Sequence, residues 1–248
     1  MRYFFEISYR GTGYHGWQSQ TNARGVQQVV EEVLQKLYRK AIPIVASGRT
    51  DAGVHCLSQY FHLDIDQQID GPSALVRVNS FLPKDIAIHA IRKVKNDAHA
   101  RYDARERVYQ YRITQSKNPF LSGFAYHYYK PLQVENMNAA AALLVGMHDF
   151  KSFSKVKTDV NHFLCEVKYA QWKEKNGMLV FDIAANRFLR GMVRAIVGSL
   201  LDIGTGKVSL AEFKKIIKGK DRKLAGMNVP PEGLYLVNVK YARGTFLR

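Results

Sequence analysis

The sequence predicts an α+β fold in which two similar lobes share a mostly antiparallel mixed sheet, with helices on one side and a central cleft. Segments with strand and helix patterns are mixed in both halves of the 248-residue chain. Hydrophobic residues make up 46% of the sequence and charged residues 23%, as in ordinary globular proteins. No low-complexity or proline-rich linker separates the halves, so we expect lobes 1–102 and 103–248 to share one continuous sheet.

The first lobe begins with a strand, because residues 2–10 alternate and are rich in aromatic side chains. Apolar residues then recur at helical spacing from Val26 to Tyr38, which predicts an amphipathic helix. The apolar segment 42–46 and the alternating segment 61–65 predict two strands on either side of a tight turn. The remaining predicted elements of this lobe are a short helix over 73–81 and a strand over 86–94.

The second lobe contains a similar mixture of elements. In chain order, we expect a strand over 108–114, an alanine-rich helix over 134–147, a hairpin, a helix over 188–203, a second helix and a strand over 234–241. The hairpin turns at Asn176-Gly177, the dipeptide that type I′ turns prefer. Ser209 and Glu212 form a capping box ahead of an apolar run, which marks the start of the second helix.

The charge of the chain is strongly unbalanced. Lysine and arginine number 37, whereas aspartate and glutamate number 21, which gives a formal net charge of +16. A surface this positive attracts polyanions, so nucleic acid is the first partner class to consider and an anionic membrane the second. A generically basic soluble protein is the alternative that charge alone leaves open.

Cysteine use and apolar segments indicate the compartment. Cys56 and Cys165 have neither the spacing of a disulfide framework nor that of a zinc site, which suggests a reducing environment and no metal. The N-terminal residues lack the hydrophobic region of a signal peptide, and no apolar run is long enough to span a bilayer. We therefore expect a soluble, cytoplasmic protein that does not associate with membranes.

A glycine-rich segment after the first strand raises the possibility of a nucleotide cofactor. Residues 11–16 fit the pattern G-x-G-x-x-G of dinucleotide-binding enzymes. That mechanism needs a helix to begin at the glycines, so that its N-terminus faces the pyrophosphate. Here Trp17, polar residues and Arg24-Gly25 precede the helix that begins at Val26. We therefore disfavour a dinucleotide site at these glycines.

The turn between the two strands of the first lobe carries the strongest chemical signal. Gly48-Arg49-Thr50-Asp51-Ala52-Gly53-Val54-His55 places an acid, an arginine and two glycines in one short stretch. Turn glycines let the backbone bend and let a ligand approach closely. An isolated aspartate in a turn is more often a solvated residue that stabilises the turn.

Two further clusters lie in the second lobe. Tyr109 and Tyr111 fall on one face of the predicted strand, where they could be core residues or a stacking platform for a base. Arg187, Arg190 and Arg194 are spaced i, i+3, i+7, so we expect them to lie on one face of the predicted helix, opposite much of its apolar stripe. A solvated basic face is the alternative interpretation of these arginines.

Together these segments resemble the tRNA pseudouridine synthase A family. The stretches that carry the resemblance are Tyr9–Gln18, Gly48–His55, His99–Ala104 with Arg107–Tyr111, Phe188–Arg194 and Pro230–Leu236, so that it covers nearly the whole chain. The chain departs from the family pattern at a few positions. Arg10 stands where an aspartate is common, Gly191 where a histidine is, and Cys56 and Val229 where alanine is.

The resemblance implies roles for seven residues. Asp51 would be the catalytic residue, and Tyr109 would stack on the target base and take part in catalysis. Arg194 would pair with Asp51 and keep it ionised in a desolvated pocket. Arg49 would contact RNA phosphate or help to open the stem. The remaining substrate-binding residues would be Arg187, Arg190 and Leu236.

The resemblance also implies an activity: an isomerase that converts uridine to pseudouridine on the 3′ side of the anticodon stem-loop of tRNA. This reaction is redox-neutral and loses no atoms of the base, so we expect no cofactor, metal or nucleotide. The implied partners are tRNA and a second copy of the chain in a homodimer. The sequence leaves open the preferred tRNAs, how neighbouring uridines are all reached, and whether Asp51 attacks C1′, adds to C6 or assists loss of a sugar proton. A tRNA-binding or chaperone protein without catalysis is the alternative.

Overall fold

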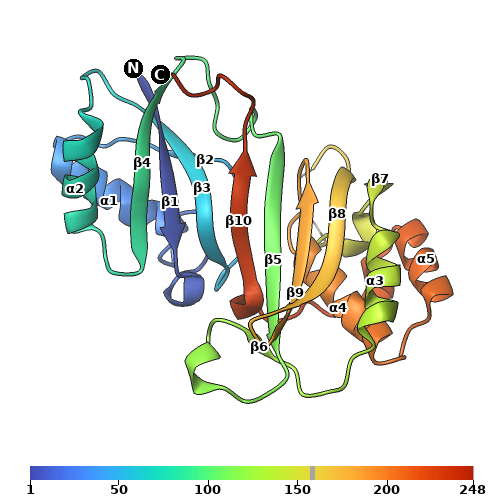
Figure 1. Ribbon diagram of the computed structural model, residues 1–248. Helices are drawn as coiled ribbons and strands as arrows, with labels where there is room; N and C mark the ends of the chain where they lie inside the picture. The colour runs from blue at the N-terminus through green and yellow to red at the C-terminus, as the bar shows by residue number, and fades with distance from the viewer. Residues whose placement is uncertain (157–159, 248) are drawn as a thin grey trace. The chain divides into compact units, whose positions relative to one another are not determined.

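The computed structural model describes residues 1–156 and 160–247 and divides into two compact units. Unit 1 comprises Met1–Arg105 and Leu236–Arg248, and unit 2 comprises Glu106–Tyr235. The division lies close to the one expected at residue 102, but the C-terminal segment belongs to unit 1. Both units combine strands that pair mostly in antiparallel fashion with α-helices, which confirms the α+β fold class (Figure 1).

Unit 1 is built on strands in the order β4-β1-β3-β10, with the short β2 paired to β3. Its elements are β1 (Arg2–Tyr9), the 3₁₀ turn η1 (Gly11–Gly13), α1 (Val26–Tyr38), β2 (Val45–Ala46), β3 (His55–Asp64), α2 (Gly71–Phe81) and β4 (Ile86–Val94), with β10 spanning Leu234–Lys240. The rings of Phe5 and Phe61 stack in the core at 5.0 Å, on paired positions of β1 and β3. The α2 helix packs against β4, and α1 packs against α2.

The pattern of apolar residues predicts α1 correctly at both ends. Its buried side chains are Val26, Val29, Val30, Val33 and Leu34. The helix ends where Arg39 adopts a left-handed conformation with a φ of 54°. By contrast, the strand expected over 42–46 is shorter than predicted, because only Val45 and Ala46 pair with β3.

Unit 2 is built on strands in the order β5-β9-β8-β7, with β6 paired parallel to β5. Its elements are β5 (Glu106–Thr114), η2 (Pro119–Leu121), β6 (Tyr126–His127), α3 (Val134–Ala142), β7 (Gly146–Asp149), η3 (Lys151–Phe153), β8 (Leu164–Lys175), β9 (Met178–Ala185), α4 (Met192–Gly204), α5 (Leu210–Gly219), η4 (Arg222–Leu224) and η5 (Pro231–Gly233). The α3 helix packs against β8, α4 and α5. The core of this unit includes Trp172 and Phe181, whose rings lie 5.0 Å apart.

Two local predictions for unit 2 are confirmed. Asn176 and Gly177 both have positive φ, 51° and 71°, as a type I′ turn requires, and they join β8 to β9. Ser209 and Glu212 form the capping box at the start of α5, with each side chain bonded to the backbone of the other residue.

Two helix boundaries are wrong in the sequence prediction. The α3 helix ends at Ala142, and Gly146, with a φ of 105°, leads the chain into β7, so Met147 lies in a strand. The α4 helix begins at Met192 because Gly191, with a φ of 73°, interrupts the helical conformation. The segment from Phe188 to Arg190 is therefore not helical.

Candidate active site

Asp51 lies in the turn that joins β2 to β3 in unit 1, where its side chain is half-buried. The turn is tight: the Val54 amide donates to the carbonyl of Asp51 at 3.2 Å, and Gly53 adopts a positive φ of 78°. Arg49 is exposed, whereas Thr50, which lies between Arg49 and Asp51, is buried. Thr50 is therefore a buried anchor between the exposed Arg49 and the half-buried Asp51.

The anchor belongs to a buried network of polar side chains. The hydroxyl groups of Tyr9 and Thr50 lie 2.7 Å apart. Gln59 donates from Nε2 to the Tyr9 hydroxyl at 3.0 Å, so that hydroxyl can donate in turn to Thr50. All three residues are less than 9% exposed. Because buried polar groups are costly to leave without partners, this network fixes the backbone directly before Asp51.

The glycine-rich segment after β1 supports the same turn from the other side. The Trp17 amide donates to the Thr50 carbonyl, and the Gly53 amide donates to the Tyr14 carbonyl, both at 3.2 Å. A Cβ on Gly16 would lie 2.5 Å from the Thr50 carbonyl oxygen, and a Cβ on Gly11 would lie 2.0 Å from that of Val54. These glycines are therefore needed for close backbone contact with the Asp51 turn.

This close backbone contact explains why residues 11–16 carry glycines in the G-x-G-x-x-G spacing of a dinucleotide site. Gly11 to Gly13 form a 3₁₀ turn, and α1 begins only at Val26, after Gly25. No helix N-terminus follows the glycines in this described segment, so the arrangement that holds a pyrophosphate is missing there.

In unit 2, Tyr109 lies on β5 opposite Ile183 of β9 and is half-buried. Its ring meets that of Phe188 edge-on, with centroids 5.0 Å apart and an interplanar angle of 81°. Tyr111 is fully buried, and its hydroxyl donates to the Pro230 carbonyl at 2.8 Å. Of the two tyrosines, only Tyr109 retains accessible surface for a ligand.

The three arginines that the sequence predicted as site residues of unit 2 occupy different settings. Arg194 lies in the first turn of α4 and is half-buried, and its Nε donates to the Val229 carbonyl at 2.7 Å. Arg187 lies before the helix, with Nη1 3.3 Å from Nε2 of His162. Arg190 is exposed in the turn ahead of Gly191. The prediction of one arginine-lined helix face is therefore wrong, because the helix begins after two of the three.

Two further expectations concern Leu236 and the pairing of Arg194 with Asp51. Leu236 is 0% exposed, so its burial gives no support to the expected contact with substrate. Asp51 belongs to unit 1, whereas Tyr109 and Arg194 belong to unit 2. The Asp51–Arg194 pair that the family resemblance implies therefore stays a prediction.

Two features of the structure were not predicted from the sequence. Tyr9, Thr50 and Gln59 act together only because β1 and β3 pair, and no spacing in the sequence signals that contact. The second feature is a run of exposed lysines on and after α5, which a scan for charge runs would have found. These lysines are Lys214, Lys215, Lys218, Lys220 and Lys223.

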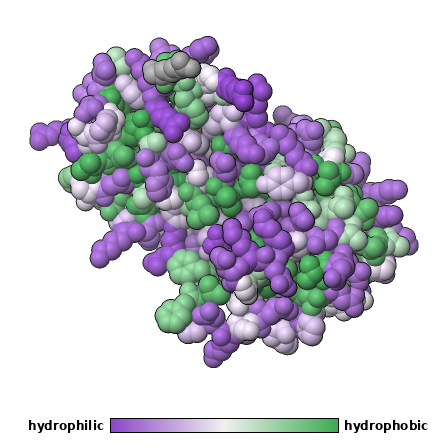
Figure 2. All heavy atoms as spheres, viewed as in Figure 1, coloured by the Kyte–Doolittle hydropathy of each residue, from purple (hydrophilic) through white to green (hydrophobic). Residues whose placement is uncertain are grey.

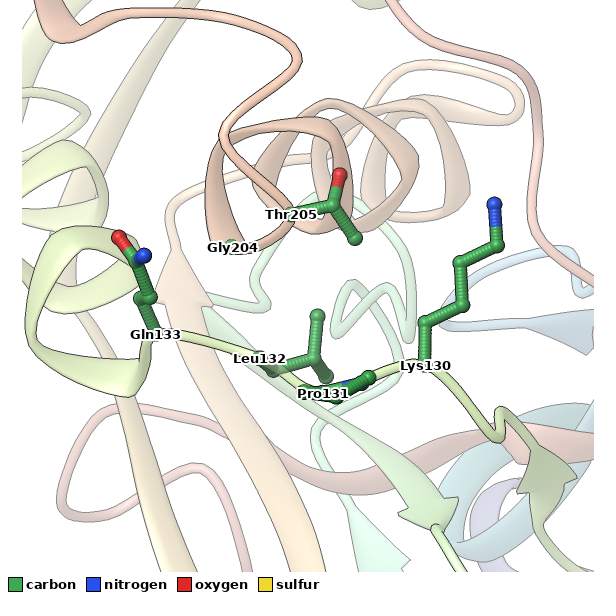
Figure 3. Close-up of a pocket in the computed structure, with 6 residues that line it drawn as sticks. All are labelled: Lys130, Pro131, Leu132, Gln133, Gly204 and Thr205. Carbon is green, nitrogen blue, oxygen red and sulfur yellow. The ribbon is translucent and has the colours of Figure 1, made fainter.

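Figure 3 shows a separate pocket of unit 2, with a volume of about 490 Å³. Pro131 and Leu132, from the segment before α3, face Thr205 at the end of α4, and Lys130 lies beside them. The backbone amide of Gln133 donates to the Gly204 carbonyl at 2.9 Å, which joins the segment before α3 to the end of α4. None of the predicted site residues lines this pocket.

The described residues contain neither a cluster of metal-binding side chains nor a helix that could span a membrane. Among residues 1–156 and 160–247, His, Cys, Asp and Glu form no group of three or more that could hold a metal ion. Within the same residues, no helix has the length and apolarity to cross a membrane.

The fold is mostly antiparallel α+β, and a buried polar network holds the Asp51 turn within it. Residues 7–103 and 140–242 match the family model described as tRNA pseudouridine synthase. The chain therefore belongs to the tRNA pseudouridine synthase family, and it is an isomerase that converts uridine to pseudouridine in tRNA.

Curated relatives extend this similarity over nearly the whole chain. The chain is 46% identical to tRNA pseudouridine synthase A of Porphyromonas gingivalis over 250 residues, which covers 99% of both chains. It is 43% identical to tRNA pseudouridine synthase A of Bacteroides thetaiotaomicron over 248 residues, which covers 99% of this chain and 92% of the relative. It is also 41% identical to the same enzyme of Limosilactobacillus reuteri, with 97% and 96% of the two chains covered.

Proposed function

We propose that the chain isomerises uridines in the anticodon stem-loop of tRNA and that Asp51 is the catalytic residue. The observation that carries the proposal is the construction of the Asp51 turn. A buried network holds the residue before Asp51, and glycine backbone packs against the turn. Holding a reactive group in a fixed position is a large part of enzymatic rate enhancement.

The reaction needs one ionised carboxylate close to the ribose and uracil. The N1–C1′ bond breaks, the base rotates, and a C5–C1′ bond forms. The proton leaves C5 and N1 gains one, so atoms and electrons balance without an oxidant or reductant. Asp51 could attack C1′, add to C6 or assist loss of a sugar proton, and the proposal is compatible with each route.

The proposal also assigns roles to Tyr109 and Arg194. Tyr109 keeps accessible surface on the β5 face where Tyr111 and Ile113 are buried, and the edge-on Phe188 ring holds its orientation. An aromatic face of this kind can stack on a base that has left the RNA helix. Arg194 is held through its Nε by the Val229 carbonyl, and we assign it the role of orienting Asp51.

The proposal also covers RNA contacts, the compartment and the oligomeric state of the protein. Arg49 is exposed two residues before Asp51, where it could contact phosphate near the target uridine. Arg187 and Arg190 lie in the segment that precedes α4 and would add further contacts. We also propose a cytoplasmic homodimer that works without a metal or cofactor, as the family resemblance implies.

The test is release of tritium from tRNA labelled at C5 of uridine, since C5 loses its hydrogen when it bonds to C1′. We expect release by the unmodified chain, and none by Asp51→Asn, in buffer without metal or nucleotide. Binding of tRNA by both proteins is the control for folding. Release by both proteins would move the catalytic role to another residue, and release only from uridines outside the anticodon stem-loop would overturn the proposed substrate site.

A further inference from the structure

One loop of unit 2 has the composition of a nucleic-acid contact although it carries none of the predicted site residues. Residues 115–130, which we call the aromatic loop, connect β5 with the segment before α3. The loop contains two lysines, Lys117 and Lys130, and no aspartate or glutamate. Its aromatic residues are Phe120, Phe124, Tyr126, Tyr128 and Tyr129.

Two aromatic side chains of this loop are largely exposed to solvent. Phe120 is 90% exposed in the short η2 turn, and Tyr129 is 75% exposed. Figure 1 shows the green loop extending beyond the end of β5, and Figure 2 shows hydrophobic atoms at the edge of the molecule in that region. An aromatic side chain this exposed buries little in the isolated chain, so its packing does not explain its presence.

The loop is nevertheless well ordered by hydrogen bonds. Asn118 accepts through Oδ1 from the Phe120 amide at 2.9 Å, which fixes the tip. The Tyr235 hydroxyl donates to the Phe124 carbonyl at 2.6 Å, and Gln115 donates to the Lys130 carbonyl at 3.2 Å. A loop that is already ordered loses little conformational entropy when it binds a partner.

This chemistry suits an unpaired base of RNA. Aromatic side chains stack on bases regardless of sequence, and lysines attract the phosphate backbone. The same loop of a second copy fits less well, because two aromatic loops placed face to face would bring Lys117 and Lys130 of both copies together. We propose that Phe120 stacks on an unpaired base of bound tRNA other than the uridine that is isomerised. The inference rests on the proposed function, because it takes tRNA as the ligand.

The test compares tRNA binding by Phe120→Ala, Phe120→Leu and Phe120→Trp, each in an Asp51→Asn background so that the RNA is not modified. We expect the Kd for tRNA to rise about tenfold in the alanine variant, to rise nearly as much with leucine, and to recover with tryptophan. Phe81→Ala is the matched control, since Phe81 is a 56% exposed phenylalanine at the end of α2. This control is expected to bind tRNA with the original Kd.

A fully paired RNA of similar length is the control ligand. It offers no unpaired base, so its Kd is expected to be the same for all these variants. An equal loss of affinity for tRNA and paired RNA, an unchanged Kd for tRNA, or full recovery by leucine would each overturn the stacking contact. A change in oligomeric state or in binding to anionic vesicles, with tRNA affinity unchanged, would assign the loop to a second copy or a membrane. These binding measurements do not depend on which residue is catalytic, so they fail or succeed separately from the tritium test.

Discussion

The hydroxyl of Tyr9 lies 2.7 Å from that of Thr50, the residue directly before Asp51. Tyr9 is the last residue of β1, and Thr50 lies in the turn ahead of β3, so the bond joins a core strand to the proposed catalytic turn. Gln59 of β3 donates to the same Tyr9 hydroxyl. The backbone directly before Asp51 is thus held by side chains of the buried strands β1 and β3.

We expect Tyr9→Phe to lower kcat for pseudouridine formation about tenfold, because small displacements of a reacting group are costly. The variant leaves the Thr50 hydroxyl and the Gln59 amide without their buried partner, and it should lose about 1–3 kcal/mol of unfolding free energy. Steady-state kinetics and urea unfolding measure the two effects.

Tyr3→Phe is the matched control for this variant. Tyr3 is also buried in β1, and its hydroxyl accepts from the Ile69 amide at 3.1 Å, in a contact that does not involve the turn. We expect it to lose comparable stability while kcat stays within about twofold. Equal kcat in Tyr9→Phe and the parent chain would show that the network does not position Asp51.

Gly16→Ala tests the backbone contact that supports the turn. The new Cβ would lie 2.5 Å from the Thr50 carbonyl oxygen, at a residue whose φ is 88°. We expect a loss of about 2 kcal/mol or more in stability and a clear loss of activity, because the turn must move to relieve the contact. Gly13→Ala, where no atom lies within 4 Å of the new Cβ, should behave like the parent chain. Thermal unfolding and tritium release distinguish the two variants, and similar behaviour of both would contradict the role of Gly16.

The parts that the sequence predicted are those governed by local patterns. The helix from Val26 to Tyr38 follows its apolar spacing, and the Asn176-Gly177 turn follows the φ that these residues tolerate. The start of α4 was missed because Phe188 and Leu189 continue an apolar stripe, whereas the positive φ of Gly191 is not visible in a periodicity.

The candidate site also combines features that local sequence patterns predict with features that only the fold brings together. Asp51 could be placed in a turn from the flanking strand patterns and the neighbouring glycines. Its support by Gln59 could not, since Tyr9 and Gln59 meet only through the register of β1 and β3, which pairs Ile7 with Gln59. Contacts between residues distant in sequence are fixed by the fold, and a single sequence carries no direct signal of them.

The exposed lysines of α5 provide a prediction about salt. Replacing Lys214, Lys215 and Lys218 together by alanine should weaken tRNA binding and lower the slope of log Kd against log salt concentration by about one to two, because each lysine at a phosphate releases a counterion. The triple arginine variant keeps the charge and should keep the slope. Filter binding at several salt concentrations measures both. An unchanged slope in the alanine variant would place the tRNA away from α5.

His62 gives a prediction about pH. It is 5% exposed, and its Nδ1 accepts from the Ala100 amide at 3.1 Å. Burial, followed by the charges of Arg2 and His99, lowers the pKa of His62 to about 4, while Asp64 and Asp103 oppose that shift. The folded chain therefore keeps the imidazole neutral in a range where the unfolded chain protonates it.

The sign of the effect follows from this difference. As the pH falls from about 6.5 to about 4, the unfolded state gains a proton that the folded state does not bind, so the unfolding free energy decreases by on the order of 2 kcal/mol. His62→Asn keeps an acceptor for the Ala100 amide and removes the titrating group, so its stability should change less over the same pH range. His127→Asn replaces an exposed histidine and should follow the parent chain. Urea unfolding between pH 4.5 and 7.5 measures the three proteins, and parallel curves for the parent chain and His62→Asn would mean that other groups cause the acid sensitivity.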